Sequence, residues 1–222
     1  MKLKLLLALL FPLAGYAQPF KFKSTGTAKP IELTLAWHNI GKGAGVLYKG
    51  KSEWITLKVK SFEVDSSERG NGSPDEDTYK WLEVYKGKIT GEYGVKVMLR
   101  NVYEMYYVRY SDQKKFNFEY VEEKGRYDGK NIALLHGVQF DYNTSYNDLL
   151  TIKYGNGESQ NIQLPKLTKE GSRYCLIKDY NGDGLDDISF SYHIYKPSKT
   201  PVSIFIYDPK TKKFNQKANT TR

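Results

Sequence analysis

The segment that most constrains the fold is residues 179–187, which read DYNGDGLDD and place oxygen-bearing side chains at alternate positions. The glycine at position 184 permits the sharp turn that such a short loop needs. Ca²⁺ binds six to eight oxygen atoms at roughly 2.3–2.6 Å, and alternate residues of a curled loop can direct their oxygens inward. The expected calcium ligands are side-chain oxygens and one backbone carbonyl, from Asp179, Asn181, Asp183, Leu185 and Asp187.

This loop departs from the helix–loop–helix calcium motif. Phe190 stands where that motif has a bidentate glutamate, and residues 188–194 alternate in the manner of a strand. The sequence therefore predicts a strand, a calcium loop and a second strand. The alternative is a metal-free turn rich in Asp and Gly, but a plain hairpin needs only two to five turn residues. Four acidic residues within nine positions also repel one another unless a cation neutralises them.

Short alternating segments separated by turn residues occur along most of the chain, which predicts an all-β protein. Asn156-Gly157 is the strongest hairpin signal. The expected architecture is antiparallel, a propeller-like or sandwich-like assembly of hairpins with one calcium-binding loop. The expected strands are residues 31–37, 46–48, 54–64, 81–85, 89–93, 116–121, 132–140, 149–154, 160–164 and 202–207, with Phe214 returning to the core.

The secondary structure of one segment and the boundary between the two halves are harder to predict from the sequence. Residues 99–110 carry apolar side chains at helical spacing, but their Val and Tyr content favours a strand, and a short helix is the alternative. A soft boundary is expected within residues 142–148. It divides a β-rich N-terminal half of unassigned role, residues 18–148, from a C-terminal half, residues 149–222, with the calcium loop and a basic tail.

Residues 1–17 resemble a secretory signal peptide. Lys2 and Lys4 precede an apolar run, and small residues lead to a cleavage site expected after Ala17. The mature protein is therefore expected in the periplasm, with secretion as the alternative. No later apolar run reaches about 18 residues, so we expect no transmembrane segment. The single Cys175 cannot form an internal disulfide and is interpreted as a small buried hydrophobic residue.

Positive charge is concentrated at the C-terminus. The formal charge of the chain is +9, and residues 196–222 hold seven basic residues against the single acid Asp208. This segment could face an anionic partner, or it could be a solvated edge strand with a frayed tail. Nucleic acid is not an expected partner of an exported protein.

We find no residue set that predicts catalysis. The three histidines lie far apart, and His193 shares a strand face with Ser189 and Ser191, which we interpret as a solvated polar face. The acidic runs Glu122-Glu123 and Asp75-Glu76-Asp77 lie in turn-like sequence, where solvation explains them. We therefore expect a protein that is not an enzyme.

The C-terminal half resembles a family of exported bacterial proteins. A hydrophobic pair at 176–177, the Asp-x-Asn-x-Asp-Gly-x-x-Asp loop, the strand after it and an aromatic strand ending at Phe214 follow the pattern of that family. It comprises relatives of the periplasmic inhibitor of invertebrate-type lysozyme, including immunity proteins that neutralise glycoside-hydrolase effectors. The similarity covers residues 149–214. The same loop occurs in integrin-type propeller repeats, but those repeat it several times and this chain has it once.

The resemblance implies binding and inhibition rather than catalysis. The expected function is that of an exported calcium-binding inhibitor or immunity protein whose partner is an envelope-directed hydrolase or secreted effector. Many lysozymes are basic and would be repelled by the basic C-terminal segment unless it lies off the interface, so the general role is preferred to a named target. The alternative is a cell-envelope binding module for glycan or protein without inhibitory activity.

Export gives the first testable prediction. Protein purified from the cell envelope should lack residues 1–17 and begin at Gln18, because signal peptidase cleaves after a small residue. Intact-mass measurement reads this directly. A mass that retains Met1 to Ala17 would contradict the assignment.

Overall fold

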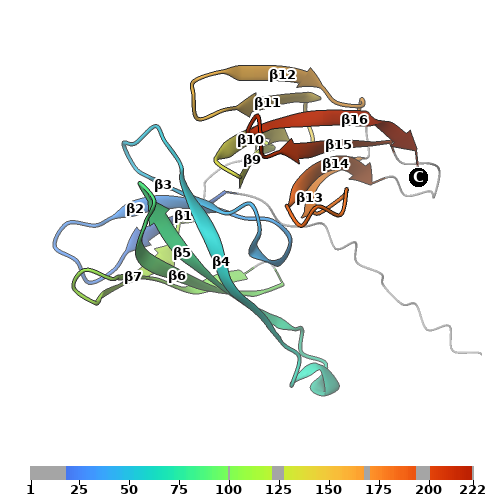
Figure 1. The fold of residues 1–222 in the computed structure, drawn as a ribbon. Helices are drawn as coiled ribbons and strands as arrows, with labels where there is room; N and C mark the ends of the chain where they lie inside the picture. Colours follow the sequence, from blue (N-terminus) through green and yellow to red (C-terminus); the bar gives the residue numbers. More distant parts are fainter. Residues whose placement is uncertain (1–18, 100, 122–127, 168–170, 194–200, 222) are drawn as a thin grey trace, which may run out of the picture.

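The computed structural model describes residues 19–99, 101–121, 128–167, 171–193 and 201–221 (Figure 1). The expected signal peptide lies outside them. The described part is built almost wholly from antiparallel strands, and its only helical elements are two single 3-10 turns, which confirms the prediction of an all-β antiparallel protein. None of the described residues forms a helix long and apolar enough to cross a membrane.

The first eight strands form a closed barrel, which the sequence did not predict. Each strand pairs with the next, and β1 pairs with β8 to close the ring, with Phe22 opposite Tyr120. The strands are β1 (Phe20–Ser24), β2 (Glu32–Ala36), β3 (Gly45–Tyr48), β4 (Ile55–Asp65), β5 (Glu76–Tyr85), β6 (Lys88–Met98), β7 (Asn101–Arg109) and β8 (Lys114–Tyr120). The ambiguous segment 99–110 is therefore mainly a strand, because it pairs on both sides inside the barrel.

Side chains fill the barrel. Alternate residues of each strand point inward, as the buried Phe20, Phe22 and Ser24 of β1 illustrate. An eight-stranded barrel is just wide enough for such a filled interior. At the end near the β2–β3 connection, Trp81 is fully buried beside Trp37 and its indole N–H donates to the carbonyl of Gly41 at 2.7 Å.

The next inward-facing residue of β5 after Trp81 is a buried carboxylate. Glu83 is 5% exposed and accepts hydrogen bonds from the hydroxyls of Tyr93 (2.7 Å), Tyr107 (2.9 Å), Tyr48 (3.1 Å) and Thr90 (2.5 Å). Two donors at each oxygen occupy its lone pairs. The cluster links β3, β5, β6 and β7, so we assign it to the structure of the barrel.

The remaining strands form two four-stranded sheets that face each other (Figure 1). One sheet has the order β12-β11-β10-β9 and the other β13-β14-β15-β16. Both contribute to one core, in which Phe140 and Ile152 of the first sheet meet Ile177, Phe190 and Phe205 of the second. The strands are β9 (Lys130–Leu135), β10 (Val138–Asn143), β11 (Leu149–Lys153), β12 (Ser159–Gln163), β13 (Ser172–Lys178), β14 (Asp187–His193), β15 (Pro201–Asp208) and β16 (Lys213–Thr221).

Several expected hairpins are present, and one expected strand is wrong. The turns at 49–51, 86–87 and 156–157 each join paired strands, and Phe214 is buried in the second core. Residues 132–140 were expected as one strand but form the β9–β10 hairpin. His136 and Gly137 both have positive φ, the geometry of a tight hairpin turn, and histidine at the first position is not the usual signal for it.

Strand pairing changes sheets between β8 and β9. Strand β8 belongs to the barrel, while β9 and β10 share a sheet with β11 and β12. The segment 142–148, where the soft boundary was expected, therefore lies within that sheet. The hydrogen bonding thus divides the described chain into a barrel, residues 20–120, and a sandwich-like pair of sheets, residues 130–221.

Candidate metal centre at the junction of barrel and sandwich

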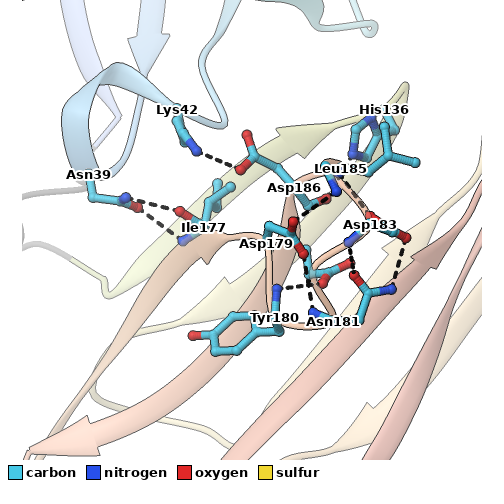
Figure 2. A network of polar contacts seen from close by, with 12 residues as sticks. Asn39, Lys42, His136, Ile177, Asp179, Tyr180, Asn181, Asp183, Leu185 and Asp186 are labelled. Carbon is cyan, nitrogen blue, oxygen red and sulfur yellow. Dashed lines mark hydrogen bonds and ion pairs between the residues drawn. The ribbon is translucent and has the colours of Figure 1, made fainter.

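The loop between β13 and β14 folds back on the carboxylate of Asp179 (Figure 2). Its Oδ1 accepts the backbone N–H of Gly182 at 2.6 Å, and its Oδ2 accepts that of Gly184 at 2.8 Å. Both glycines have positive φ, which few other residues adopt without strain. These backbone hydrogen bonds, that of Gly184 first, hold the pKa of Asp179 below its ordinary value.

The next two expected ligands lie on the exposed side of the loop. The Oδ1 of Asn181 accepts the backbone N–H of Asp183 at 3.1 Å, and its amide nitrogen donates to Asp183 Oδ2 at 2.8 Å. Asp183 Oδ1 in turn accepts the N–H of Leu185 at 2.8 Å. Asn181 and Asp183 therefore lie side by side (Figure 2), and both are exposed.

Asp187 closes the loop from its buried side. It is 0% exposed, and its oxygens accept the backbone N–H groups of Tyr180 (2.9 Å) and Tyr207 (2.8 Å). These bonds tie the start of the loop to β15. The structure assigns Asp187 this anchoring role, and its role as a calcium ligand stays a prediction.

The donor chemistry of the loop fits a hard cation. Carboxylates, an amide oxygen and a backbone carbonyl are the ligands that Ca²⁺ prefers, and a carboxylate oxygen with one hydrogen bond retains a second lone pair. Within the described ranges, however, no three acidic, histidine or cysteine side chains gather into a ready metal-binding group. In this arrangement the three carboxylates turn toward backbone amides, so binding requires their oxygens to rotate toward a common point.

The loop borders the contact between barrel and sandwich. Asp186, which the sequence did not single out as a ligand, forms an ion pair of 2.5 Å with Lys42 of the β2–β3 connection. The backbone carbonyl of the same residue bonds to the Nε2 of His136 at 2.8 Å. Lys42 and Asp186 lie 144 positions apart, so no local sequence signal could have indicated this pair.

The β2–β3 connection, residues 37–44, caps an outer strand in each sheet of the sandwich. Asn39 donates from Nδ2 to the carbonyl of Ile177 at 3.1 Å and accepts its N–H at 3.0 Å, so it satisfies the outward groups of the edge strand β13. On the edge strand β9, the N–H of Leu134 donates to the carbonyl of Gly43 at 3.0 Å. The first residue of β3 lies so close to the Leu134 side chain that a Cβ at Gly45 would lie 1.9 Å from Leu134 Cδ1.

His38 makes the third contact of this connection. Its buried ring lies 2.7 Å through Nε2 from the carbonyl of Ile132, which is the geometry of an Nε2–H donor. Burial lowers the pKa of His38 to about 4, because a charged imidazolium would lose its hydration there. The imidazole is therefore neutral at pH 7.

The other residues considered from sequence have structural surroundings. Cys175 is buried, and burial raises the pKa of its thiol. The solvated face expected for Ser189 and Ser191 is wrong, since these serines are 2% and 6% exposed on a strand with neighbours on both sides. The side chain of His193 and the Glu122-Glu123 pair lie outside the described residues.

The acidic run 75–77 and the basic C-terminal segment form surface ion pairs. Asp75 pairs with Arg69, Glu76 lies 2.9 Å from Lys96, and Lys213 on the outer strand β16 lies 2.6 Å from Glu158. Exposed pairs of this kind contribute little to stability. The turn expected at the acidic run is wrong for Glu76 and Asp77, which belong to β5, and all three acidic residues are half-buried. The pair of Lys213 with Glu158 is exposed, which agrees with a solvated edge strand at the C-terminus.

Comparison of the chain with protein-family models, with curated proteins and with solved structures gave no match.

The buried His38 gives a pH-dependent prediction. Its folded pKa of about 4 lies below the unfolded value of about 6.5, so unfolding takes up a proton as the pH falls through this window. Lowering the pH from 7 to 5 should therefore reduce the free energy of unfolding by about 2 kcal/mol, measured by urea titration. His38→Gln, which keeps a donor for Ile132, should remove most of this loss.

His136→Gln is the matched control, because His136 is exposed and its loss should leave the pH dependence intact. A wild-type protein with equal stability at pH 7 and pH 5 would contradict the role assigned to His38.

Proposed function

We propose that this protein is an exported, calcium-stabilised binding protein that occupies the surface of a protein partner, as an inhibitor or immunity protein does against an envelope-directed hydrolase. The observation that carries the proposal is the position of the oxygen-rich loop. It lies beside the contact of barrel and sandwich, where Asp186 meets Lys42. A cation at this point would hold two β units in one arrangement.

Asp179, Asn181, Asp183 and the Leu185 carbonyl would hold the ion, with Asp187 on the buried side. The bound Ca²⁺ would supply positive charge between carboxylates that otherwise repel one another. The Asp187 carboxylate, which accepts the backbone N–H groups of Tyr180 and Tyr207, then transmits the order of the loop to β15. A scaffold fixed in this way loses less conformational entropy when it binds a partner.

The surroundings of the nucleophilic candidates support binding rather than catalysis. Cys175 has a raised pKa and little access to solvent, and the two serines of β14 are buried. A nucleophile needs access and an activating base, and these positions favour neither.

The second candidate function is a cell-envelope binding module for glycan or protein that inhibits nothing. This function would use the same calcium-stabilised scaffold, and it differs in the ligand that the scaffold binds. Affinity capture from envelope extract separates the two, since the inhibitor hypothesis expects an enzyme that the protein inhibits and the module hypothesis expects none.

Calcium should raise the melting temperature. A ligand that binds only the native state stabilises by about 2.7 kcal/mol at a hundredfold excess over its Kd. Asp183→Ala should abolish the shift, because it removes a central oxygen donor. Asp208→Ala is a matched control, since Asp208 also caps an exposed turn but lies outside the loop. Identical melting curves in chelator and in millimolar calcium would refute the calcium assignment.

The proposed inhibition of a partner enzyme is tested by a separate measurement. Purified protein titrated against hydrolases captured from the same envelope should block substrate turnover at a one-to-one ratio, because it acts by occupying a surface. Asp179→Ala should weaken the block mainly through lower stability, so cooling should restore part of it. If no captured enzyme is inhibited and the captured material is glycan, the inhibitor hypothesis fails and the binding-module hypothesis replaces it.

A further inference from the structure

Two hollows on the barrel lie on either side of β8 and are distinct from the calcium loop. The first, about 420 Å³, is lined by residues of β5, β6, β7 and β8, and the second, about 510 Å³, by the β1–β2 connection and β8. Lys115 and Asn117 line both. These volumes fall in the range of small-ligand sites, and the shared residues join the hollows into one elongated surface.

The first hollow exists because β6 has a glycine and an irregularity there. The register of β6 on β7 shifts between Gly94 and Lys96, and Glu104 opposite has a φ of +49°. A Cβ at Gly94 would lie 2.3 Å from the ring of Tyr106, so only glycine lets this ring lie against the strand. The Tyr106 hydroxyl donates to Glu92 at 3.1 Å, which fixes the ring in place.

Positive charge dominates both hollows. Lys80, Lys96 and Lys115 line the first, and Lys29, Lys114 and Lys115 line the second. Lys96 is neutralised by Glu76 and Glu104, and the latter is the single acid among the described lining residues. Lys115 instead lies over the Tyr106 ring at 4.6 Å, and within the described residues Lys80 has no carboxylate partner.

The uncharged lining groups favour a sugar. Thr25, Thr27, Thr78 and Asn117 offer hydroxyl and amide groups of the kind that bond to sugar hydroxyls. A membrane would instead require protruding apolar side chains beside the lysines, and the apolar lining residues Val95, Met105, Phe116 and Phe118 are buried. We therefore propose that the barrel wall around β8 binds a negatively charged oligosaccharide, with Lys80 and Lys115 contacting its anionic groups and Asn117 its hydroxyls.

The test measures binding of the full mature chain to an oligogalacturonate hexasaccharide, by calorimetry at low salt. Maltohexaose, a neutral hexasaccharide, is the ligand control. The groove variant Lys80→Gln/Lys115→Gln should weaken binding about tenfold or more, because it removes two charge-assisted contacts. The control variant Lys51→Gln/Lys210→Gln makes the same change in net charge at two exposed positions outside the hollows and should bind like wild type.

Each result is decisive when thermal melts show both variants folded. Weaker binding of the charged hexasaccharide in the groove variant, but not in the control variant, supports the proposed site. Equal loss in both variants would show binding by net charge alone, and absence of wild-type binding to the charged hexasaccharide would also overturn the proposal. Vesicles with 30% phosphatidylglycerol form a third arm, and binding to these but not to the saccharide would assign the surface to a membrane instead. Calcium and hydrolase assays do not enter the test, so its outcome is separate from that of the proposed function.

Discussion

The arrangement of the two halves depends on how the open edges of the sandwich are covered. An edge strand presents unpaired backbone N–H and carbonyl groups, which are costly to bury without a partner. The β2–β3 connection supplies those partners on both sheets, through Asn39 at Ile177 of β13, and through Gly43 and His38 at Leu134 and Ile132 of β9. One short segment of the barrel therefore hydrogen-bonds to an edge strand of each sheet of the sandwich.

This capping also explains the unusual backbone conformation of the β2–β3 connection. Ile40 has a positive φ of 48°, unusual for a β-branched residue, and it lies directly between Asn39 and the glycine that receives the Trp81 indole bond. The barrel core holds one side of the segment through Trp81, and the sandwich edges hold the other. The conformation persists because its surroundings fix it from two directions.

The oxygen-rich loop follows closely after the capped residue of β13. Ile177 is held by Asn39, and two residues later Asp179 begins the loop. The ion pair of Asp186 with Lys42 returns the end of the loop to the same connection. An ion bound in the loop would thus act on the junction, and this proximity is the physical basis of the proposal that calcium stabilises the whole protein rather than one turn.

Local features were predictable from sequence and distant pairings were not. Asn156-Gly157 and Lys86-Gly87 indicate their hairpins because turn chemistry is encoded in neighbouring residues, and the turn at Gly184 was predictable in the same way. Barrel closure requires β1 to pair with β8, and the junction requires Asn39 to hydrogen-bond to Ile177, 138 positions away. Neither contact is encoded in neighbouring residues. Alternation also failed at Ser189 and Ser191, because period-two patterns do not show whether neighbouring strands cover small polar residues.

The central claim, that the β2–β3 connection joins barrel and sandwich into one cooperative body, is tested most directly by native-state hydrogen exchange. The amides of Ile177 and Leu134 belong to edge strands and depend on Asn39 and Gly43 for their hydrogen bonds. The account predicts that both exchange as slowly as amides of the central strands β10 and β14, through global unfolding. Exchange of Ile177 and Leu134 at the rate of the exposed β3–β4 turn would contradict it.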